Sequence, residues 1–329
     1  RARELAVSAR LSPAVTLLDC TLRDGGYVNG HDFSLEAGRD LVAHLGRSGV
    51  DYVEIGYVRR GPGAGARGLA GHCPERYIGT LAEVRGSAGL AVMAHPADLS
   101  LSDLPRLRAL GIALVRIPLA LERLAAALPY VDAARACGLE VALNVIRISE
   151  LERARLLTAL RPLAGWGVSV LYLADSNGAL APRDVHALVE DASAALGVAL
   201  GFHAHDSLGL GLSNALTALG AGASWIDGTL GGVGKGAGNA RLELLALHLQ
   251  QRGGRRFDHR ALAAAAHNVQ AYNHPRFLEF YGSALAGALD LNLEQLAGVA
   301  HDPGDPGALL AALQQRLEER DFAPLGGPT

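Results

Sequence analysis

The sequence of 329 residues predicts an α/β fold, namely a (β/α)8 TIM barrel with an appended C-terminal helical segment. Eight short apolar runs alternate with longer segments of helical periodicity, as expected for parallel strands joined by helices. A glycine separates a predicted helix from the next strand six times, at the place where helices commonly end in a left-handed residue. The length suits one barrel, since such barrels often exceed about 250 residues.

The predicted strands are short apolar runs of the kind that a parallel sheet buries on both faces. Some of them end in a charged cluster, as expected where a strand delivers side chains to the rim of the sheet. The eight runs are Val15–Cys20, Tyr52–Gly56, Leu90–Ala94, Ala113–Pro118, Glu140–Val145, Ser169–Ala174, Val198–His203 and Ser224–Asp227.

The predicted helices lie between these runs and are rich in alanine and leucine. Ser34 and Ser149 are suited to begin a helix, and Pro182 suits a first turn. The glycines that are predicted to end helices are Gly49, Gly111, Gly138, Gly167, Gly197 and Gly222. The main helical segments are Leu35–Ser48, Leu121–Cys137, Glu150–Leu163, Pro182–Leu196 and Leu208–Ala221.

Three regions are expected along the chain: an N-terminal extension (1–14), a catalytic barrel (15–250), and a C-terminal helical segment with a loose tail (251–329). The segment Tyr57–Tyr77 is rich in glycine and arginine and follows the second strand, so it is expected to be a long loop on the catalytic rim. Two interpretations stay open for it, a disordered insertion or a mobile lid that helps to hold an anionic substrate.

Composition and charge narrow the function classes. A net charge of −3, with 30 basic and 33 acidic residues, gives no electrostatic reason to bind nucleic acid or an anionic membrane. The three cysteines, Cys20, Cys73 and Cys137, are odd in number and widely spaced, which disfavours a disulfide framework. The N-terminus has no apolar core long enough for a signal peptide, and no uninterrupted apolar run is long enough to span a membrane. We therefore expect a cytoplasmic protein that acts on small molecules.

Polar side chains gather at the predicted carboxyl ends of the strands, where barrel enzymes place their reactions. His203 and His205 are two positions apart, so they project from the same face of one strand, and Asp24 follows another strand. The further strand-end residues are Arg23, Glu54, His95, Arg116, Asn144, Arg147, Asp175, Ser176, Asp206 and Asn239.

A metal site is the favoured interpretation of Asp24, His203 and His205, against the alternative of histidines with structural roles. Two imidazoles, one carboxylate and water ligands favour Mn²⁺ or Mg²⁺ before Zn²⁺, and no cysteine is placed to select zinc. His95 is left out of the ligand set because Pro96 follows it and it has no paired partner.

The glycine-rich loop Gly231–Asn239 follows the last predicted strand. It could cradle a phosphate through its backbone N–H groups, but Gly236 follows Lys235 where a Walker motif requires serine or threonine. The favoured interpretation is a tight turn that packs against the metal site. Whether Asn239 is a fourth ligand or an outer contact stays open.

Three motifs together resemble those of the DRE-TIM metallolyase superfamily, also called the HMGL-like superfamily. They are Thr21–Gly25, His203–Asp206 and the loop that ends in Gly238–Asn239. The resemblance covers roughly residues 15 to 245. It implies a (β/α)8 barrel with a divalent cation held by Asp24, His203 and His205. It also implies that Arg23 stabilises the enolate of a 2-oxo acid or acyl substrate.

Within this superfamily, the loop Thr229–Glu243 is most similar to that of the pyruvate-dependent 4-hydroxy-2-oxovalerate aldolases. Val233 occupies the position of the catalytic cysteine of the hydroxymethylglutaryl-CoA lyases, which makes that activity unexpected. Asp175–Ser176 is also similar to the aldolase pattern, in which the serine region helps to hold the oxo-acid carboxylate. The aldolases carry a histidine base three residues after the metal aspartate, where this chain has Tyr27. An ordinary tyrosine pKa near 10 requires lowering by the metal or by Arg23 for that role.

The expected function is therefore a divalent-metal-dependent aldolase or lyase that makes or breaks a C–C bond next to a 2-oxo acid. Its partners would be small molecules, pyruvate and an aldehyde, and a homodimer is expected by analogy. Two alternatives stay open: a Claisen-type synthase joining an acyl-CoA to a 2-oxo acid, and a catalytically silent barrel that serves as a scaffold. The assigned roles are catalysis for Arg23 and Tyr27, metal binding for Asp24, His203, His205 and Asn239, and substrate binding for Glu54, Asn144, Asp175 and Ser176.

Overall fold

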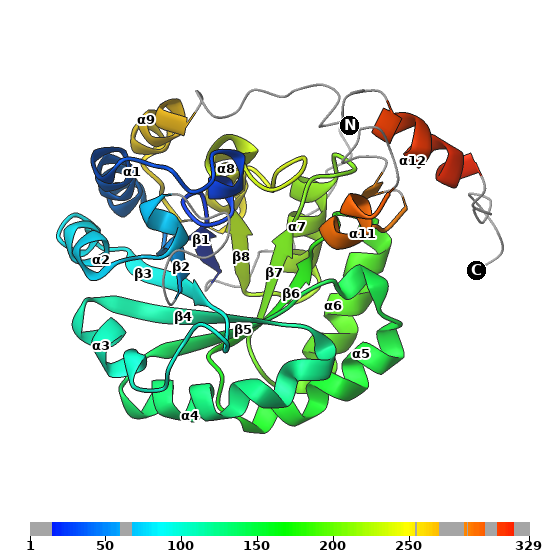
Figure 1. Ribbon diagram of the computed structural model, residues 1–329, viewed down its shortest axis with the longest axis horizontal. Helices are drawn as coiled ribbons and strands as arrows, with labels where there is room; N and C mark the ends of the chain where they lie inside the picture. The colour runs from blue at the N-terminus through cyan, green and yellow to red at the C-terminus, as the bar shows by residue number, and fades with distance from the viewer. Residues whose placement is uncertain are drawn as a thin grey trace, which may run out of the picture.

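The computed structural model describes residues 15–59, 68–253, 255–269, 286–287, 289–299 and 308–318. Eight parallel strands close into a barrel in chain order, with β1 paired to β8, and helices surround it (Figure 1). The predicted fold class is thus confirmed, with each strand end within two residues of its predicted position. The strands are β1 (Thr16–Asp19), β2 (Tyr52–Val58), β3 (Gly89–Ala94), β4 (Ile112–Leu119), β5 (Glu140–Val145), β6 (Val170–Asp175), β7 (Leu200–Ala204) and β8 (Trp225–Gly228).

The α-helices follow the predicted alternation, and two of them, α1 and α6, have the predicted bounds. Ser34 caps α1 as predicted, since its hydroxyl accepts a hydrogen bond of 3.0 Å from the Ala37 N–H. The helices are α1 (Leu35–Ser48), α2 (Glu75–Ala82), α3 (Asp103–Ala109), α4 (Leu128–Ala136), α5 (Arg153–Leu160), α6 (Pro182–Leu196), α7 (Gly211–Gly220), α8 (Leu242–Gly253), α9 (His259–Val269), α11 (Leu293–Ala297) and α12 (Ala308–Glu318).

Two of the predicted helices are interrupted. The segment predicted as one helix from Leu121 starts as a 3-10 helix, η3 (Leu121–Ala127), and becomes α4 where Pro129 fits a first turn. Ser149 does not begin a helix of the predicted kind, because it lies inside the short 3-10 helix η4 (Ile148–Glu150). The α-helix there begins later, after Glu152. The helix predicted from Leu208 also begins later, at Gly211.

The glycines predicted to end helices all have positive φ. Gly49 and Gly222, at 93° and 115°, show the conformation that a side chain makes costly. The long loop expected between Tyr57 and Tyr77 is shorter than predicted, because β2 continues to Val58 and α2 begins at Glu75. The centre of that segment, where the lid was expected, lies outside the described residues.

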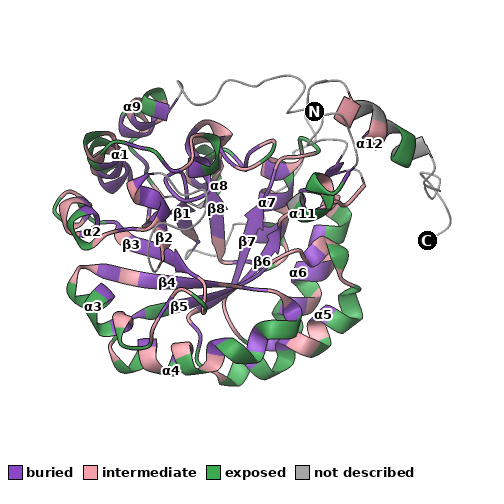
Figure 2. Cartoon of the chain, viewed as in Figure 1, coloured by how far each residue is buried: buried purple, intermediate pink, exposed green. Residues whose placement is uncertain are grey.

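The barrel strands are buried on both faces, whereas the outer faces of the helices are exposed (Figure 2). Side chains alternate along each strand, so every second residue points into the barrel lumen. The part of the lumen farther from the carboxyl ends of the strands is apolar, and its cluster of buried side chains includes Leu18, Leu114 and Tyr172. Further toward the carboxyl ends, β2, β4 and β8 instead contribute Glu54, Arg116 and Asp227, all buried. The lumen therefore changes from apolar to charged as it approaches the catalytic rim.

The described parts of the C-terminal region are helical, as predicted. The helix α9 packs against α1 on the outside of the barrel (Figure 1). The stretch before and within α11 instead contacts the loops after β5 and β6. There Asn177 Nδ2 donates to Asp290 Oδ1 at 2.8 Å, and Arg147 Nη2 lies 3.0 Å from Glu294 Oε2. Within the described ranges, no helix has the length and apolar character needed to cross a membrane.

Candidate metal centre

His203 and His205 come from the end of β7, and both are buried. His203 Nδ1 donates to Asp227 Oδ2 at 2.9 Å, and His205 Nδ1 donates to the Gly238 carbonyl at 3.2 Å. Each bond fixes the Nδ1–H tautomer and leaves the lone pair of Nε2 free to bind a cation. Burial lowers the pKa of His205 to about 3, so its ring is neutral, as a metal ligand must be.

Asp24 follows β1 at the start of the 3-10 helix η1 (Gly25–Val28). Its Oδ2 lies 3.8 Å from His203 Nε2 and pairs with Arg23 Nη1, while its Oδ1 accepts Asn239 Nδ2 at 2.8 Å. Burial would raise the pKa of Asp24, but the positive charge of Arg23 and the hydrogen bond from Asn239 oppose it, and that pKa lies far below its ordinary value. The carboxylate is therefore ionised and ready to bind a cation.

The ligand set fits a divalent ion. Ligand atoms of Asp24, His203 and His205 all lie within 4.8 Å of one another, close enough to surround one cation. Asn239 Oδ1 is buried and has no hydrogen-bond partner among the described residues, although the same amide donates to Asp24 through Nδ2. A buried carbonyl oxygen without a partner beside this triad suits a fourth ligand. The expectation that these four residues meet at one site is consistent with the geometry.

A second cluster was not predicted from the sequence. Cys20 joins His203 and Asp227 in a group whose ligand atoms also lie within 4.8 Å of one another. Burial raises the pKa of the Cys20 thiol well above its ordinary value, and its sulfur donates to the Gly228 carbonyl at 3.4 Å. A protonated thiol is a poor ligand, so this cluster is less suited to a cation than the first one.

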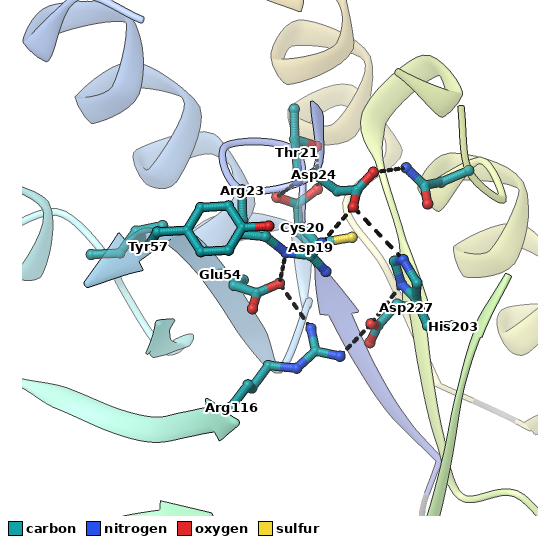
Figure 3. Close-up of polar contacts among 12 residues, drawn as sticks. Asp19, Cys20, Thr21, Arg23, Asp24, Glu54, Tyr57, Arg116, His203 and Asp227 are labelled. Atoms are coloured by element: carbon teal, nitrogen blue, oxygen red, sulfur yellow. Dashed lines mark hydrogen bonds and ion pairs between the residues drawn. The ribbon is translucent and has the colours of Figure 1, made fainter. Parts of the chain in front are cut away.

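A chain of buried charges supports the triad from below (Figure 3). Glu54 Oε2 accepts Arg23 Nε at 2.8 Å and also Arg116 Nη1 at 2.8 Å. Arg116 Nη2 then reaches Asp227 Oδ2 at 2.5 Å, the same oxygen that accepts from His203. Arg116 is 0% exposed, so every charge in this chain is held by another charge rather than by water.

The glycine-rich loop forms tight turns against the site, as predicted. Gly234 admits no side chain, because a Cβ there would lie 2.0 Å from Asn239 Nδ2 and 2.8 Å from Asp24 Oδ1. The Leu230 N–H donates to Thr21 Oγ1 at 2.9 Å, which joins the loop after β8 to the segment after β1. The loop is therefore shaped to bring Asn239 to Asp24.

Tyr27 lies at the edge of the site and is 43% exposed. Its hydroxyl is 2.9 Å from the hydroxyl of Tyr57, which is directed toward Arg23 and Asp24 (Figure 3). Burial raises the pKa of Tyr57 well above its ordinary value, so Tyr57 stays protonated. His31, for which the sequence indicated no role, is buried beneath this pair, and its Nε2 lies 3.0 Å from the Arg23 carbonyl.

The remaining predicted residues divide into two groups. Glu54 and Asn144 point into the lumen, and Asn144 Oδ1 is buried without a hydrogen-bond partner in the described part of the chain. Ser176 lines a partly open cavity at the rim, next to His205. Asp175 instead faces away from the lumen, where its carboxylate accepts the N–H groups of Ala179 and Leu180 at 3.1 Å each. Burial raises its pKa to about 6.

Sequence reasoning missed Asp227, Tyr57 and His31. Asp227 is the last residue of a predicted apolar strand, and a charge in that position was a usable signal, because a buried strand rarely carries an unpaired charge. Tyr57 was assigned to the loop after β2 because the predicted strand stopped at Gly56. His31 reaches the site through the tight path of η1, and a φ of 62° at this residue has no sequence signature.

Comparison with known proteins gives concordant matches. The sequence pattern of the HMGL-like family matches residues 120–273. An oxaloacetate decarboxylase from Mycobacterium tuberculosis is 33% identical over 242 residues, which cover 72% of this chain and 70% of that protein. A 4-hydroxy-2-oxovalerate aldolase from Carboxydothermus hydrogenoformans is 31% identical over 248 residues, covering 74% and 73%.

The likeness extends to a solved structure. The N-terminal domain of an aldolase candidate from Bacteroides vulgatus shares 28% sequence identity with this chain and superposes with a TM-score of 0.74. The match covers 86% of this chain and 96% of that chain. Because relatives above 30% identity cover more than two thirds of both chains, the resemblance seen in the motifs is confirmed. The chain belongs to the HMGL-like family.

Proposed function

We propose that this protein is a divalent-metal-dependent, class II aldolase acting on pyruvate and an aldehyde. It makes or breaks the C–C bond next to the 2-oxo acid. The observation that carries the proposal is the convergence of Asp24, His203 and His205 beside the buried guanidinium of Arg23. Relatives named 4-hydroxy-2-oxovalerate aldolase support the same reaction class.

The residues present would hold Mn²⁺ or Mg²⁺ through Asp24, His203, His205 and Asn239. When bound, such an ion supplies Lewis acidity to the keto oxygen of a 2-oxo acid. Arg23 adds a positive charge for the enolate oxygen, and its guanidinium is fixed in advance by Asp24 and Glu54. A preorganised contact of this kind contributes about 100-fold to 1000-fold in rate.

The proton balance of the reaction assigns a role to Tyr27. In the synthetic direction, the pyruvate methyl group loses a proton, the new C–C bond forms, and the aldehyde oxygen takes up a proton. Tyr27 is proposed to move this second proton, with its hydroxyl oriented by the 2.9 Å contact to Tyr57. The exposed position of Tyr27 permits exchange of that proton with water.

The substrate-binding roles are proposed for the polar groups that face the site. Glu54 acts through Arg23, whose position it fixes. Asn144, with its unpaired carbonyl in the lumen, and Ser176, at the rim cavity, are proposed to contact the 2-oxo acid. The Asp175 carboxylate is occupied by backbone N–H groups, so its contribution is to shape the loop that carries Ser176.

A second candidate reaction is the decarboxylation of oxaloacetate. A relative of that name is 33% identical over 242 residues. Loss of CO₂ from oxaloacetate leaves the same pyruvate enolate that retro-aldol cleavage of a 4-hydroxy-2-oxo acid leaves. The centre described above suits both reactions, because both need the enolate to be stabilised. They differ in the molecule that leaves the enolate, which is CO₂ in one case and an aldehyde in the other.

The decisive experiment measures deuterium incorporation at the methyl group of pyruvate in D₂O, by the purified protein with Mn²⁺ and after chelator treatment. Metal-dependent exchange is expected, and we expect Asp24→Ala, His203→Ala and His205→Ala to abolish both exchange and Mn²⁺ binding. The control is His44→Ala, on the outer face of α1. Undiminished exchange after chelation would refute the proposal, and absence of exchange under all conditions would favour the scaffold alternative.

Product analysis by mass spectrometry then separates the candidate reactions. Pyruvate is supplied with an aldehyde or with acetyl-CoA, and oxaloacetate is supplied alone. An aldol product is expected, whereas condensation with acetyl-CoA would indicate the Claisen-type synthase. We further propose a cytoplasmic location and a homodimer, and analytical ultracentrifugation tests the latter.

A further inference from the structure

Lys235 is the sole lysine in the chain. Lysine and arginine together number 30, so the other 29 basic residues are arginine. This single lysine stands in the glycine-rich loop, between Gly234 and Gly236, and its backbone N–H donates to Asp24 Oδ1 at 3.2 Å. The position of the lysine backbone is therefore tied directly to the candidate metal centre.

Lys235 lines the rim cavity together with His205, a candidate metal ligand. Ser176 and Ser207 supply hydroxyl groups to the same cavity, and Leu291 and Leu296, from the C-terminal segment, supply an apolar wall. The cavity thus begins beside the metal centre and combines a cation, hydroxyl donors and an apolar surface. This is the lining expected around a short carbon chain that ends in an anion.

The ammonium group of Lys235 makes no hydrogen bond or ion pair with any residue in the described part of the chain. Two carboxylates of the neighbouring loops have other partners, since Asp290 accepts from Ser149 and Glu150 accepts from Asn292. Glu294 is paired with Arg147. Among the residues that the structure describes, the lysine therefore has no ion-pair partner.

The buried centre does not need this lysine to hold the first substrate. Arg23 and Arg116 carry two positive charges, and the three carboxylates around them carry three negative charges, which leaves −1. A divalent cation brings the sum to +1, and the carboxylate of a 2-oxo acid brings it to zero. The charge of Lys235 is then left for a second anionic group.

Lysine differs from arginine in a way that suits the cavity. Its ammonium is a compact charge with three donors on a flexible stem, so it can reach an anion inside a narrow space.

We propose that Lys235 forms an anion-binding subsite for the second substrate, and that this substrate is an aldehyde with a carboxylate or phosphate group at its far end. The inference rests on the proposed aldolase function. It adds the substrate class, since the aldehyde carbon would lie near His205 and the anion at Lys235, with the carbon chain against Leu291 and Leu296.

Turnover with matched aldehydes tests the subsite. The ratio of kcat/KM for 4-oxobutanoate to that for butanal is measured with pyruvate and Mn²⁺, and glycolaldehyde phosphate is compared with propanal to separate carboxylate from phosphate. The wild-type protein is expected to prefer an anionic aldehyde. Lys235→Met is expected to lower that preference by at least about tenfold, as for the loss of a charge-assisted hydrogen bond. Lys235→Arg is expected to restore part of it.

The matched control is Arg108→Met, which removes one exposed positive charge near the end of α3, at the opposite end of the barrel. It should leave the preference unchanged. Equal kcat/KM for charged and neutral aldehydes in the wild-type protein would overturn the inference while pyruvate exchange continues. Absence of metal-dependent exchange would overturn the proposed function and the inference with it.

A second measurement needs no turnover and no variant. Because Lys235 is the sole lysine, limited acetylation with acetic anhydride reports on one side-chain amine, with the α-amino group as the internal reference. Butanedioate, in the presence of pyruvate and Mn²⁺, is expected to protect Lys235 from acetylation, whereas butanamide is not. Equal acetylation with and without butanedioate would contradict an anion at this position.

Discussion

The substitution Asp227→Asn tests how far the buried charges control metal binding. Asp227 Oδ2 accepts both Arg116 Nη2 at 2.5 Å and His203 Nδ1 at 2.9 Å, while Oδ1 has no hydrogen-bond partner within the ranges that the structure describes. The amide oxygen of asparagine can take the place of Oδ2, and its NH₂ group can take the unpartnered position. The variant therefore keeps the shape and both hydrogen bonds but loses the charge.

Two magnitudes follow from this geometry. Loss of the carboxylate behind a ligating histidine weakens metal binding by about 10-fold to 100-fold, or roughly 1.4 to 2.8 kcal/mol. Breaking a buried ion pair costs about 3 to 5 kcal/mol of stability. Because Glu54 still pairs with Arg116, we expect the lower end of that range, about 3 kcal/mol.

Isothermal titration of Mn²⁺ into chelator-stripped protein measures the first quantity, and urea unfolding without metal measures the second. The matched control is Asp51→Asn, which breaks an Arg–Asp pair of 2.8 Å, formed with Arg255 on the amino side of β2 and remote from the metal centre. It should reduce stability without changing Mn²⁺ affinity. Wild-type Mn²⁺ affinity in Asp227→Asn would refute the reasoning.

Three further predictions concern other parts of the site. Gly234→Ala places a Cβ 2.0 Å from the Asn239 amide and should weaken Mn²⁺ binding at least about tenfold, whereas Gly79→Ala, with open space around it, should stabilise α2 by about 1 kcal/mol, both measured by titration and urea unfolding. The raised pKa of Asp175, about 6 against 3.8, means that the folded state holds the proton more tightly, so its stabilising contribution is present at low pH and is lost as pH rises from about 4 to 6. This change amounts to about 3 kcal/mol, and Asp175→Asn should flatten the wild-type pH profile of unfolding in that window; parallel profiles would contradict the assignment. Tyr27→Phe should lower kcat for aldol cleavage by about 100-fold with little loss of stability, because its hydroxyl is exposed, and an unchanged kcat would exclude it as the proton carrier.

The fold was predictable from the sequence because a parallel barrel repeats its pattern. Apolar runs, helical periodicity and glycines recur in register, so an error at one element does not displace the next. The prediction failed in detail where local chemistry competes with helix periodicity. Pro129 divides the helix predicted from Leu121, and the backbone around Ser149 follows a 3-10 path that periodicity does not reveal.

The candidate ligands were predictable because their spacing is a property of strands. His203 and His205 share a face by alternation, and Asp24 follows the strand that closes the barrel beside them. The supporting residues were harder to predict, since a contact such as Arg116 to Asp227 joins positions 111 residues apart. Such pairings depend on the register between strands, which a single sequence does not specify.

The orientation of Asp175 shows a further limit. It ends a strand, as a site residue should, but an odd or even position in the strand decides whether a side chain enters the lumen. Tyr172, three positions earlier on the same strand, points inward, so Asp175 points outward and binds the loop.

The contacts between the segments that follow the first and the last strand have a consequence for folding. Thr21 accepts from Leu230, and Asp24 accepts from both Lys235 and Asn239, so the residues just after the first strand meet partners that are synthesised more than 200 residues later. At the proposed metal centre, high affinity for a divalent ion would therefore arise only after the last strand has docked. Ion capture and completion of the native topology would then be thermodynamically linked, so that the free energy of unfolding rises with the concentration of free metal.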